Sequence, residues 1–289
     1  MILVVGATGK LGGRIARELL SRRLPVRALC RDGSGHGALQ RMGAEIALGD
    51  LKDPESLARA CAGADTVITT ANTARRSGDD TVDRVDLAGT RSLIDAAAQA
   101  GVGHFVYTSV LGASPSHKVP FFAAKGASEA HLRASGVPWT ILAPNAFMDW
   151  WPAVVVGAPA LAGRPIVLVG DARRRHTFIA EHDVAAFGVA AVVNPAVRNR
   201  HLPLGGPQAV SWRGVVECYE RVLGRELPVQ FVPPGEAVEG VNPMLLGLLA
   251  MHDTYDSDID TAPVARELGV PLTPLEPWVR ASVASVRRV

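Results

Sequence analysis

Short runs of apolar residues recur along the first half of the chain, and segments with helical spacing separate them. The runs are rich in Val, Ile, Leu and Ala, and they fall at residues 2–5, 26–30, 45–50, 65–71, 104–110 and 139–144. Between them, segments such as KLGGRIARELLSR (10–22) repeat apolar residues every three or four positions. Continuous apolar strands that alternate with helices are typical of a parallel sheet buried on both faces. The pattern therefore predicts an α/β fold, a doubly wound parallel sheet with a ligand crevice at the carboxyl ends of its strands.

The alternation changes after Pro144. The pattern there predicts three strands and two helices before a largely helical tail, with strands at 164–170, 176–180 and 228–233 and helices at 181–194 and 211–225. We expect the first two of these strands to pair with each other, and the Pro/Gly-rich HLPLGGPQ (201–208) to be a loop. The sequence thus indicates one domain over residues 1–150. A smaller α+β region over 151–289 would cover a substrate, with some segments returning to the sheet.

Composition narrows the class of protein. Hydrophobic residues make up 48% of the chain and charged residues 20%, as in soluble globular proteins. The net charge of +2, without a basic stripe and interleaved aromatics, argues against a nucleic-acid partner. The longest apolar stretch, 150–163, is too short and too rich in proline to span a membrane. Cys30, Cys61 and Cys218 have neither metal-ligand nor disulfide spacing, so we expect no metal site. Met1 leads directly into an apolar strand, which predicts a cytoplasmic protein without a signal sequence.

The strongest local signal is VVGATGKLGGRIARELL (4–20), which follows a strand and opens a helix. In this context the first glycine permits a tight turn, the second allows close approach of a pyrophosphate, and the third lets the helix pack on the sheet. The helix N-terminus then offers N–H groups and a partial positive charge to phosphates. The alternative is an ordinary Gly-rich turn. Six residues are expected to line the phosphates: Gly6, Thr8, Gly9, Lys10, Leu11 and Gly12.

The glycine spacing G-x-x-G-x-x-G over Gly6, Gly9 and Gly12, combined with the motif GATG (6–9), resembles the short-chain dehydrogenase/reductase superfamily, especially its atypical members. The resemblance continues through VRALCRD (26–32), GDL (49–51), GTRSLIDAAAQAGVGHFVYTSVLGA (89–113), WTILAPNAFMD (139–149) and HTFIAEHDVA (176–185). This series looks like the NmrA-like, isoflavone reductase-like branch. The resemblance covers most of the chain, and its specific motifs lie in the first 150 residues. It implies that residues 1–150 form an NAD(P)-binding Rossmann domain.

Arg31 stands at the end of the second strand, about twenty residues beyond the glycines, where an acidic residue would favour NAD(H). Arg31 and Lys10 can converge on a 2′-phosphate, so we predict NADP(H) in preference to NAD(H). The alternative is a solvated Arg31 paired with Asp32. By resemblance, Asp50 and Leu51 would border the adenine, and three residues after the fourth strand would line the cofactor: Thr70, Ala71 and Asn72.

PFFAAKGASE (120–129) raises the question of the proton donor. Many reductases of this superfamily place a Tyr four residues before the Lys, and here that position is Phe121. The resemblance places Ser109 and Lys125 beside the nicotinamide ribose, and in isoflavone reductase-like relatives a Lys here acts without the Tyr. Alternatively, Lys125 is a surface charge. The proton could come from Ser109, His117, Lys125 or water, and more remotely from Tyr255; His117 is a candidate because histidine titrates near neutrality.

PNAFMDWW (144–151) would follow the sixth strand. By resemblance, Pro144, Asn145 and Phe147 would contact the cofactor. Met148 and Trp150 would shape a substrate pocket with Phe121. The competing interpretation is packing between the two domains.

These features favour an NADPH-dependent oxidoreductase that transfers hydride to a small carbonyl, enone or quinone-type substrate. The other class is a non-catalytic redox sensor, as NmrA-like regulators are, which binds NAD(P)(H) and a protein partner. The missing Tyr favours the sensor, while Ser109 and Lys125 favour the enzyme. We expect a monomer or homodimer.

Overall fold

The computed structural model describes residues 1–74, 76 and 78–286. The chain forms two compact units. The first consists of Met1–Pro144 and Val184–Pro203, and the second of Asn145–Asp183 and the chain from Leu204 onward. The prediction from sequence placed this division between residues 150 and 151.

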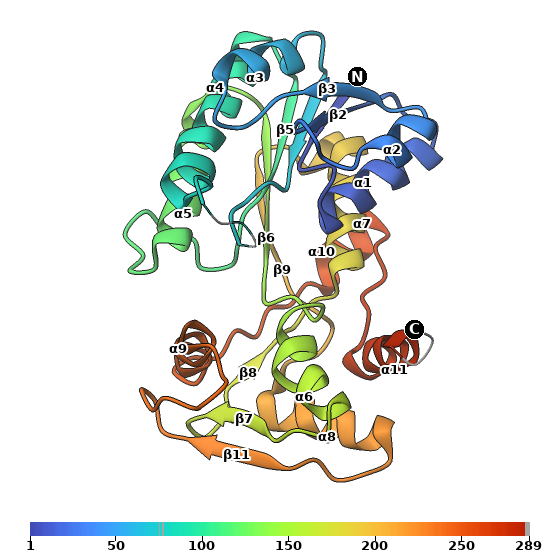
Figure 1. Cartoon of the computed structure of the whole chain (residues 1–289). Helices are drawn as coiled ribbons and strands as arrows, with labels where there is room; N and C mark the ends of the chain where they lie inside the picture. The colour runs from blue at the N-terminus through green and yellow to red at the C-terminus, as the bar shows by residue number, and fades with distance from the viewer. Residues whose placement is uncertain (75, 77, 287–289) are drawn as a thin grey trace. The chain divides into compact units, whose positions relative to one another are not determined.

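A seven-stranded sheet forms the centre of the first unit (Figure 1). Its strands, in spatial order, are β3 (Glu45–Leu48), β2 (Val26–Cys30), β1 (Ile2–Val5), β4 (Thr66–Thr69), β5 (His104–Thr108), β6 (Trp139–Pro144) and β9 (Arg200–Leu204). The pairs from β3 through β6 are parallel. All four residues of β1 are buried, as a strand covered on both faces requires. The predicted doubly wound α/β fold is confirmed.

Helices cover both faces of this sheet. Figure 1 shows α3, α4 and α5 on one face and α1 and α7 on the other. The helical segments are α1 (Lys10–Ser21), α2 (Gly37–Arg41), α3 (Pro54–Cys61), η1 (Val82–Gly89), α4 (Thr90–Gln99), α5 (Pro120–Ala134), α7 (Glu181–Val193) and η3 (Pro195–Val197). The π-helical η1 runs directly into α4. Together these elements bury an aliphatic core that includes Leu3, Leu57, Leu93 and Ile141.

The segment HLPLGGPQ contains a strand, so its prediction as a loop is wrong. β9 is the last strand of the sheet and lies beside β6. Leu202 and Leu204 are buried while His201 and Pro203 are exposed, which is the alternation of a strand with one covered face. Proline lacks the N–H that an inner strand must donate, but an edge strand tolerates it. The proline and the following glycines obscured this alternation.

The second unit contains two small strand pairs. β7 (Ile166–Val169) runs parallel to β11 (Val229–Val232), and β8 (Arg175–His176) runs antiparallel to β10 (Val210–Ser211). The predicted pairing of 164–170 with 176–180 is therefore wrong. The Asp253 carboxylate accepts hydrogen bonds from the backbone N–H groups of Asp171 (3.0 Å) and Ala172 (2.8 Å). This contact ties the turn after β7 to the end of α9 (Pro243–His252), and each of the two strands pairs with a segment far away in the sequence, β11 or β10.

Helices complete the second unit: η2 (Ala153–Gly157), α6 (Ala158–Leu161), α8 (Trp212–Leu223), α9 (Pro243–His252), α10 (Ala262–Leu268) and α11 (Leu275–Val286). Its core joins Phe178, Trp212, Tyr219 and Val279. Among the described residues, no helix combines the length and the apolar character needed to cross a bilayer.

Candidate functional site

The phosphate loop connects β1 to α1. Gly6 has a φ of +85°, which favours glycine, and a Cβ at this position would lie 2.8 Å from Thr70 Oγ1. A Cβ on Gly12 would lie 2.6 Å from the same oxygen and would collide with the Gly6 carbonyl. The N-cap residue Gly9 gives the helix no side-chain cap. The loop is thus compact, and the first N–H groups of α1 are left without a side-chain acceptor.

The loop after β4 lies against the phosphate loop. Val5 and Thr69 are partners at the carboxyl ends of β1 and β4, and the Thr70 N–H donates to the Val5 carbonyl (3.0 Å). The Asn72 amide donates to the Thr70 carbonyl (3.2 Å), which closes a local turn. Since the strand order reverses between β1 and β4, these predicted cofactor residues gather at the topological switch point of the sheet.

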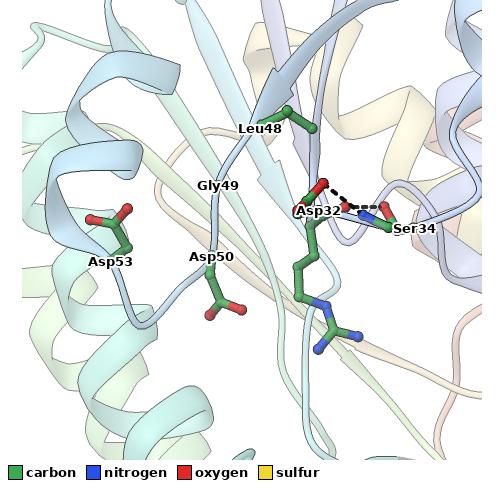
Figure 2. Close-up of a pocket in the computed structure, with 8 residues that line it drawn as sticks. Asp32, Ser34, Leu48, Gly49, Asp50 and Asp53 are labelled. Atoms are coloured by element: carbon green, nitrogen blue, oxygen red, sulfur yellow. Dashed lines mark hydrogen bonds between the residues drawn. The ribbon is translucent and has the colours of Figure 1, made fainter.

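An open cleft of about 730 Å³ lies at the ends of β2 and β3 (Figure 2). Its lining consists of Arg31, Asp32, Gly33, Ser34, Leu48, Gly49, Asp50 and Asp53. Figure 2 shows the carboxylates of Asp32, Asp50 and Asp53 turned in different directions. Each carboxylate accepts a hydrogen bond from a nearby backbone N–H group: Asp32 from Gly33, Asp50 from Lys52, and Asp53 from the first turn of α3. The predicted residues Arg31 and Asp50 thus share one cleft, next to the buried Leu51.

Arg31 pairs with Asp80 and not with Asp32. The distance from Arg31 Nη1 to Asp80 Oδ2 is 2.9 Å, and Asp80 also binds Lys52 (2.6 Å) and Arg76 (3.3 Å). The hydrogen bond from Lys52 and the surrounding cations hold the pKa of Asp80 below its ordinary value, against the opposing effect of burial. These four residues form the Asp80 cluster. Sequence reasoning missed it because its members come from three separate loops.

Lys125 lies inside the first unit, so its interpretation as a surface charge is wrong. Its side chain is 2% exposed, and its Nζ donates to the Thr108 carbonyl (3.2 Å). The same ammonium lies over the rings of Tyr107 (4.9 Å) and Phe121 (5.6 Å). Burial lowers the pKa of Lys125, and the nearby carboxylate of Asp86 opposes this shift.

Asp86 is the counter-ion of Lys125, and sequence reasoning did not find it. Its fully buried Oδ1 lies 3.7 Å from Lys125 Nζ. Its Oδ2 accepts from the N–H (3.1 Å) and the hydroxyl (2.5 Å) of Thr73, in the loop after β4. The signal was present in VDRVDLAGT: Asp86 shares helical spacing with Thr90 and Leu93, which are both buried. An acid on a buried helix face requires a partner.

Ser109 is engaged with a second buried carboxylate. Its hydroxyl donates to Glu129 Oε1 at 2.5 Å, while Glu129 Oε2 lies 2.9 Å from Arg133 and 3.7 Å from His201. Burial alone would raise the pKa of Glu129, but the hydrogen bonds from His201, Ser109 and Arg133 lower it on balance. Glu129 is one helical turn beyond Lys125 on α5, so the same reasoning about buried helix faces could have found it.

His117 lies on the loop before α5, and its ring stacks on Phe122 at 4.7 Å. Its Nδ1 accepts from the Val119 N–H (3.0 Å), so a neutral His117 carries its proton on Nε2. Tyr107 is a core residue, 1% exposed, and burial raises its pKa.

The predicted residues beyond Pro144 belong to the second unit. The Asn145 amide donates to the Ser257 hydroxyl (3.0 Å) and to Thr177 Oγ1 (3.2 Å). Met148 is 2% exposed and packs in the core of this unit. Trp150 meets Trp151 edge to face at 4.8 Å, and Phe147 forms an isolated bridge with Ile179. Their contacts with a cofactor or substrate remain predictions.

Comparison with known proteins places these features in context. The NmrA-like family model matches residues 1–277. The chain is 32% identical over 232 residues to an NAD(P)H azoreductase of Xenophilus azovorans, covering 80% of this chain and 76% of that protein. It is 31% identical over 234 residues to the photosystem II assembly factor Ycf39 of Cyanophora paradoxa, covering 80% and 71% respectively. The fold matches an NADPH-dependent quinone oxidoreductase from Escherichia coli complexed with NADPH, with a TM-score of 0.81, 23% identity and coverage of 98% and 100%.

Proposed function

The chain belongs to the NmrA-like family, and from that premise we propose that it is an NADPH-dependent oxidoreductase. Its substrate would be a small carbonyl, enone or quinone-type acceptor. The names of the azoreductase and quinone oxidoreductase relatives support the reductase class. The observation that carries the proposal is the buried Lys125, which the fold keeps at the end of β5 with Asp86 as its counter-ion.

The first unit fits a dinucleotide. The glycines at positions 6 and 12 leave no room for a Cβ, and the uncapped start of α1 faces the phosphate loop. Arg31 would bind the 2′-phosphate, and Asp50 would accept a hydrogen bond from the adenine amino group. Thr70, Ala71 and Asn72 would line the middle of the cofactor. When bound, NADPH supplies the hydride.

Lys125 would bind the ribose hydroxyls. An ammonium has three N–H donors, and the Thr108 carbonyl is the one acceptor that the described residues place within hydrogen-bond distance of Nζ. Asp86 lies slightly farther away and stabilises the charge through space. Lys125 therefore has donors to spare, and its rigid surroundings would fix the cofactor for hydride transfer.

The proton would come from water or from Nε2 of His117. The Ser109 hydroxyl donates to Glu129, and a carboxylate with a lowered pKa is a poor source of a replacement proton near neutral pH. Tyr107 is a poor candidate because burial raises the pKa of its phenol. The imidazolium form of His117 would be the donor, and forming it would require Nδ1 to give up the hydrogen bond from the Val119 N–H.

The proposal is tested by NADPH binding and turnover. NADPH affinity is measured by fluorescence, and NADPH oxidation is followed with quinones, enones and azo dyes as acceptors. We expect Lys125→Met to reduce turnover about a hundredfold. The matched control is Lys118→Met, since Lys118 is an exposed lysine on the preceding loop. If the protein binds NADPH but no acceptor leads to NADPH oxidation, the proposal that it is an enzyme is wrong.

A second candidate is a non-catalytic sensor or assembly factor. Phe121 in place of the usual Tyr favours it, as does the similarity to Ycf39. In that case NADPH would bind with no turnover, and the redox state of the nucleotide would change the affinity for a protein partner.

A further inference from the structure

The Asp80 cluster combines three cations with one carboxylate. Arg31, Lys52 and Arg76 all lie within 3.3 Å of Asp80 oxygens, so the cluster carries a formal charge of +2. The Asp80 side chain is 8% exposed, whereas Arg31 is 48% exposed and also lines the cleft at the end of β2. Arg31 is therefore the member of the cluster that reaches the cleft, where it is the cation among the lining residues beside the carboxylates of Asp32, Asp50 and Asp53.

A phosphate group could take the place of the Asp80 carboxylate between the three cations. Asp80 Oδ1 binds the Lys52 ammonium, and Oδ2 is shared by the guanidinium groups of Arg31 and Arg76. Lysine and arginine are also the side chains that bind phosphate oxygens. The carboxylate and the 2′-phosphate of NADPH would compete for the same N–H donors.

We propose that Asp80 is a specificity-determining residue, because its carboxylate holds Arg31 and Lys52 until a 2′-phosphate displaces it. This inference rests on the proposed use of NADPH. NADH has no 2′-phosphate, so it cannot displace Asp80 and binds beside an intact cluster. Asp80 thus weakens NADPH binding while it keeps the three cations ordered in the absence of a nucleotide.

Asp80→Asn removes the competing charge and keeps the size of the side chain. We expect NADPH and 2′,5′-ADP to bind about five- to tenfold more tightly at low salt, because the cluster gains one positive charge. NADH and 5′-AMP should change less than about twofold, since they lack the phosphate. The gain should shrink as salt rises, because the cluster is partly exposed.

Asp79→Asn is the matched control. Asp79 is the adjacent carboxylate, is 86% exposed and lies 3.5 Å from Arg84. This variant should leave both affinities unchanged. Lys52→Gln is the second variant, and we expect it to weaken 2′,5′-ADP about fivefold without affecting 5′-AMP. Far-UV circular dichroism establishes that each variant is folded.

Each other outcome overturns the proposal. Weaker binding of 2′,5′-ADP to Asp80→Asn means that Asp80 orders the cations and does not compete. Weaker binding of 5′-AMP means that Asp80 holds the ribose hydroxyls. Unchanged 2′,5′-ADP affinity in both Asp80→Asn and Lys52→Gln places the phosphate elsewhere. A wild-type protein that binds neither NADPH nor 2′,5′-ADP contradicts the proposed function itself.

Discussion

Replacing Asp86 with Asn isolates the charge of the buried pair. Asp86 is fully buried, Lys125 is 2% exposed, and the charged atoms lie 3.7 Å apart. Asn has nearly the same shape, and its amide oxygen can still accept the two hydrogen bonds from Thr73. The variant therefore leaves Lys125 as a buried cation without its counter-ion.

Two energies limit the expected loss in the free energy of unfolding. Removing one partner of a buried ion pair destabilises proteins by about 3–5 kcal/mol. Lys125 can also lose its proton and become neutral. Removing the proton from a lysine with an ordinary pKa of about 10.4 costs about 4.6 kcal/mol at pH 7, and this sets an upper limit on the loss of stability. We therefore expect the free energy of unfolding to fall by about 3–4 kcal/mol. Burial lowers the pKa of Lys125 and Asp86 opposes this shift, so the pKa falls further in the variant. Between that lower pKa and about pH 10.4 the unfolded variant binds more protons than the folded one, so the deficit relative to the wild type should shrink as pH rises from 7 to 10.

Urea unfolding and hydrogen exchange of peptides from η1 and α5 measure this loss. Exchange is needed because Trp139 lies in the first unit, while Trp150, Trp151, Trp212 and Trp278 lie in the second and dominate the fluorescence. Asp95→Asn is the control; Asp95 is 54% exposed beside His131, and its loss should cost less than about 1 kcal/mol.

The double variant Asp86→Asn, Lys125→Met should recover most of the lost stability, because it leaves no buried charge without a counter-ion. A loss below about 1 kcal/mol in the single variant would refute the reasoning, as would a double variant no more stable than the single one.

Three further predictions follow from the same contacts. Gly12→Ala should weaken NADPH binding at least about tenfold in the fluorescence titration, because its Cβ would collide with a carbonyl of the phosphate loop; unchanged affinity would place the phosphates elsewhere. Ser109→Ala should lower the unfolding free energy by about 1–3 kcal/mol, because Glu129 loses a donor, while NADPH affinity stays within about twofold; a large loss of affinity would instead place Ser109 on the cofactor. Burial lowers the pKa of His104 to about 4 and that of His252 to about 3. The unfolded state therefore binds more protons below about pH 6.5, and stability should fall from pH 7 to 5 by up to about 2 kcal/mol for each histidine. Equal urea midpoints at the two pH values would contradict this, and His252→Asn should reduce the slope.

The first six strands could be predicted to within about two residues, because each is a short, largely apolar run, and every residue of β1, β4 and β5 is buried. ILVV at 2–5 became β1, and WTILAP at 139–144 became β6. Beyond Pro144 the same method failed where partners are distant in sequence. β7 pairs with β11 and β8 with β10, and no local pattern in the sequence indicates pairings between segments so far apart.

The candidate site shows the same contrast between residues that a local pattern indicates and partners that are distant in the sequence. The phosphate loop and Arg31 could be predicted because each stands at a strand end, and Lys125 was predicted from the family resemblance of its segment. Their counter-ions were not found, because the pairing of Asp86 with Lys125 and of Asp80 with Arg31 depends on how loops and helices meet. Asp86 and Glu129 nevertheless carried a readable signal, since both are acids on buried faces of helices.

The buried pair also gives a physical reason for Phe121. In reductases that use a Tyr before the Lys, the lysine charge lowers the pKa of the phenol. In this protein the charge of Lys125 faces Asp86 at 3.7 Å, and Glu129 adds a second nearby negative charge. A phenol at position 121 would therefore gain little from the lysine, and the negative carboxylates would oppose its ionisation. A phenyl ring, 5.6 Å from Nζ, adds apolar contact and cation–π attraction to the same ammonium without requiring a hydrogen-bond partner. Asp86 and Phe121 thus belong to one arrangement around Lys125, and in the proposed reaction this arrangement would hold the lysine as a fixed hydrogen-bond donor while the proton comes from outside the buried cluster.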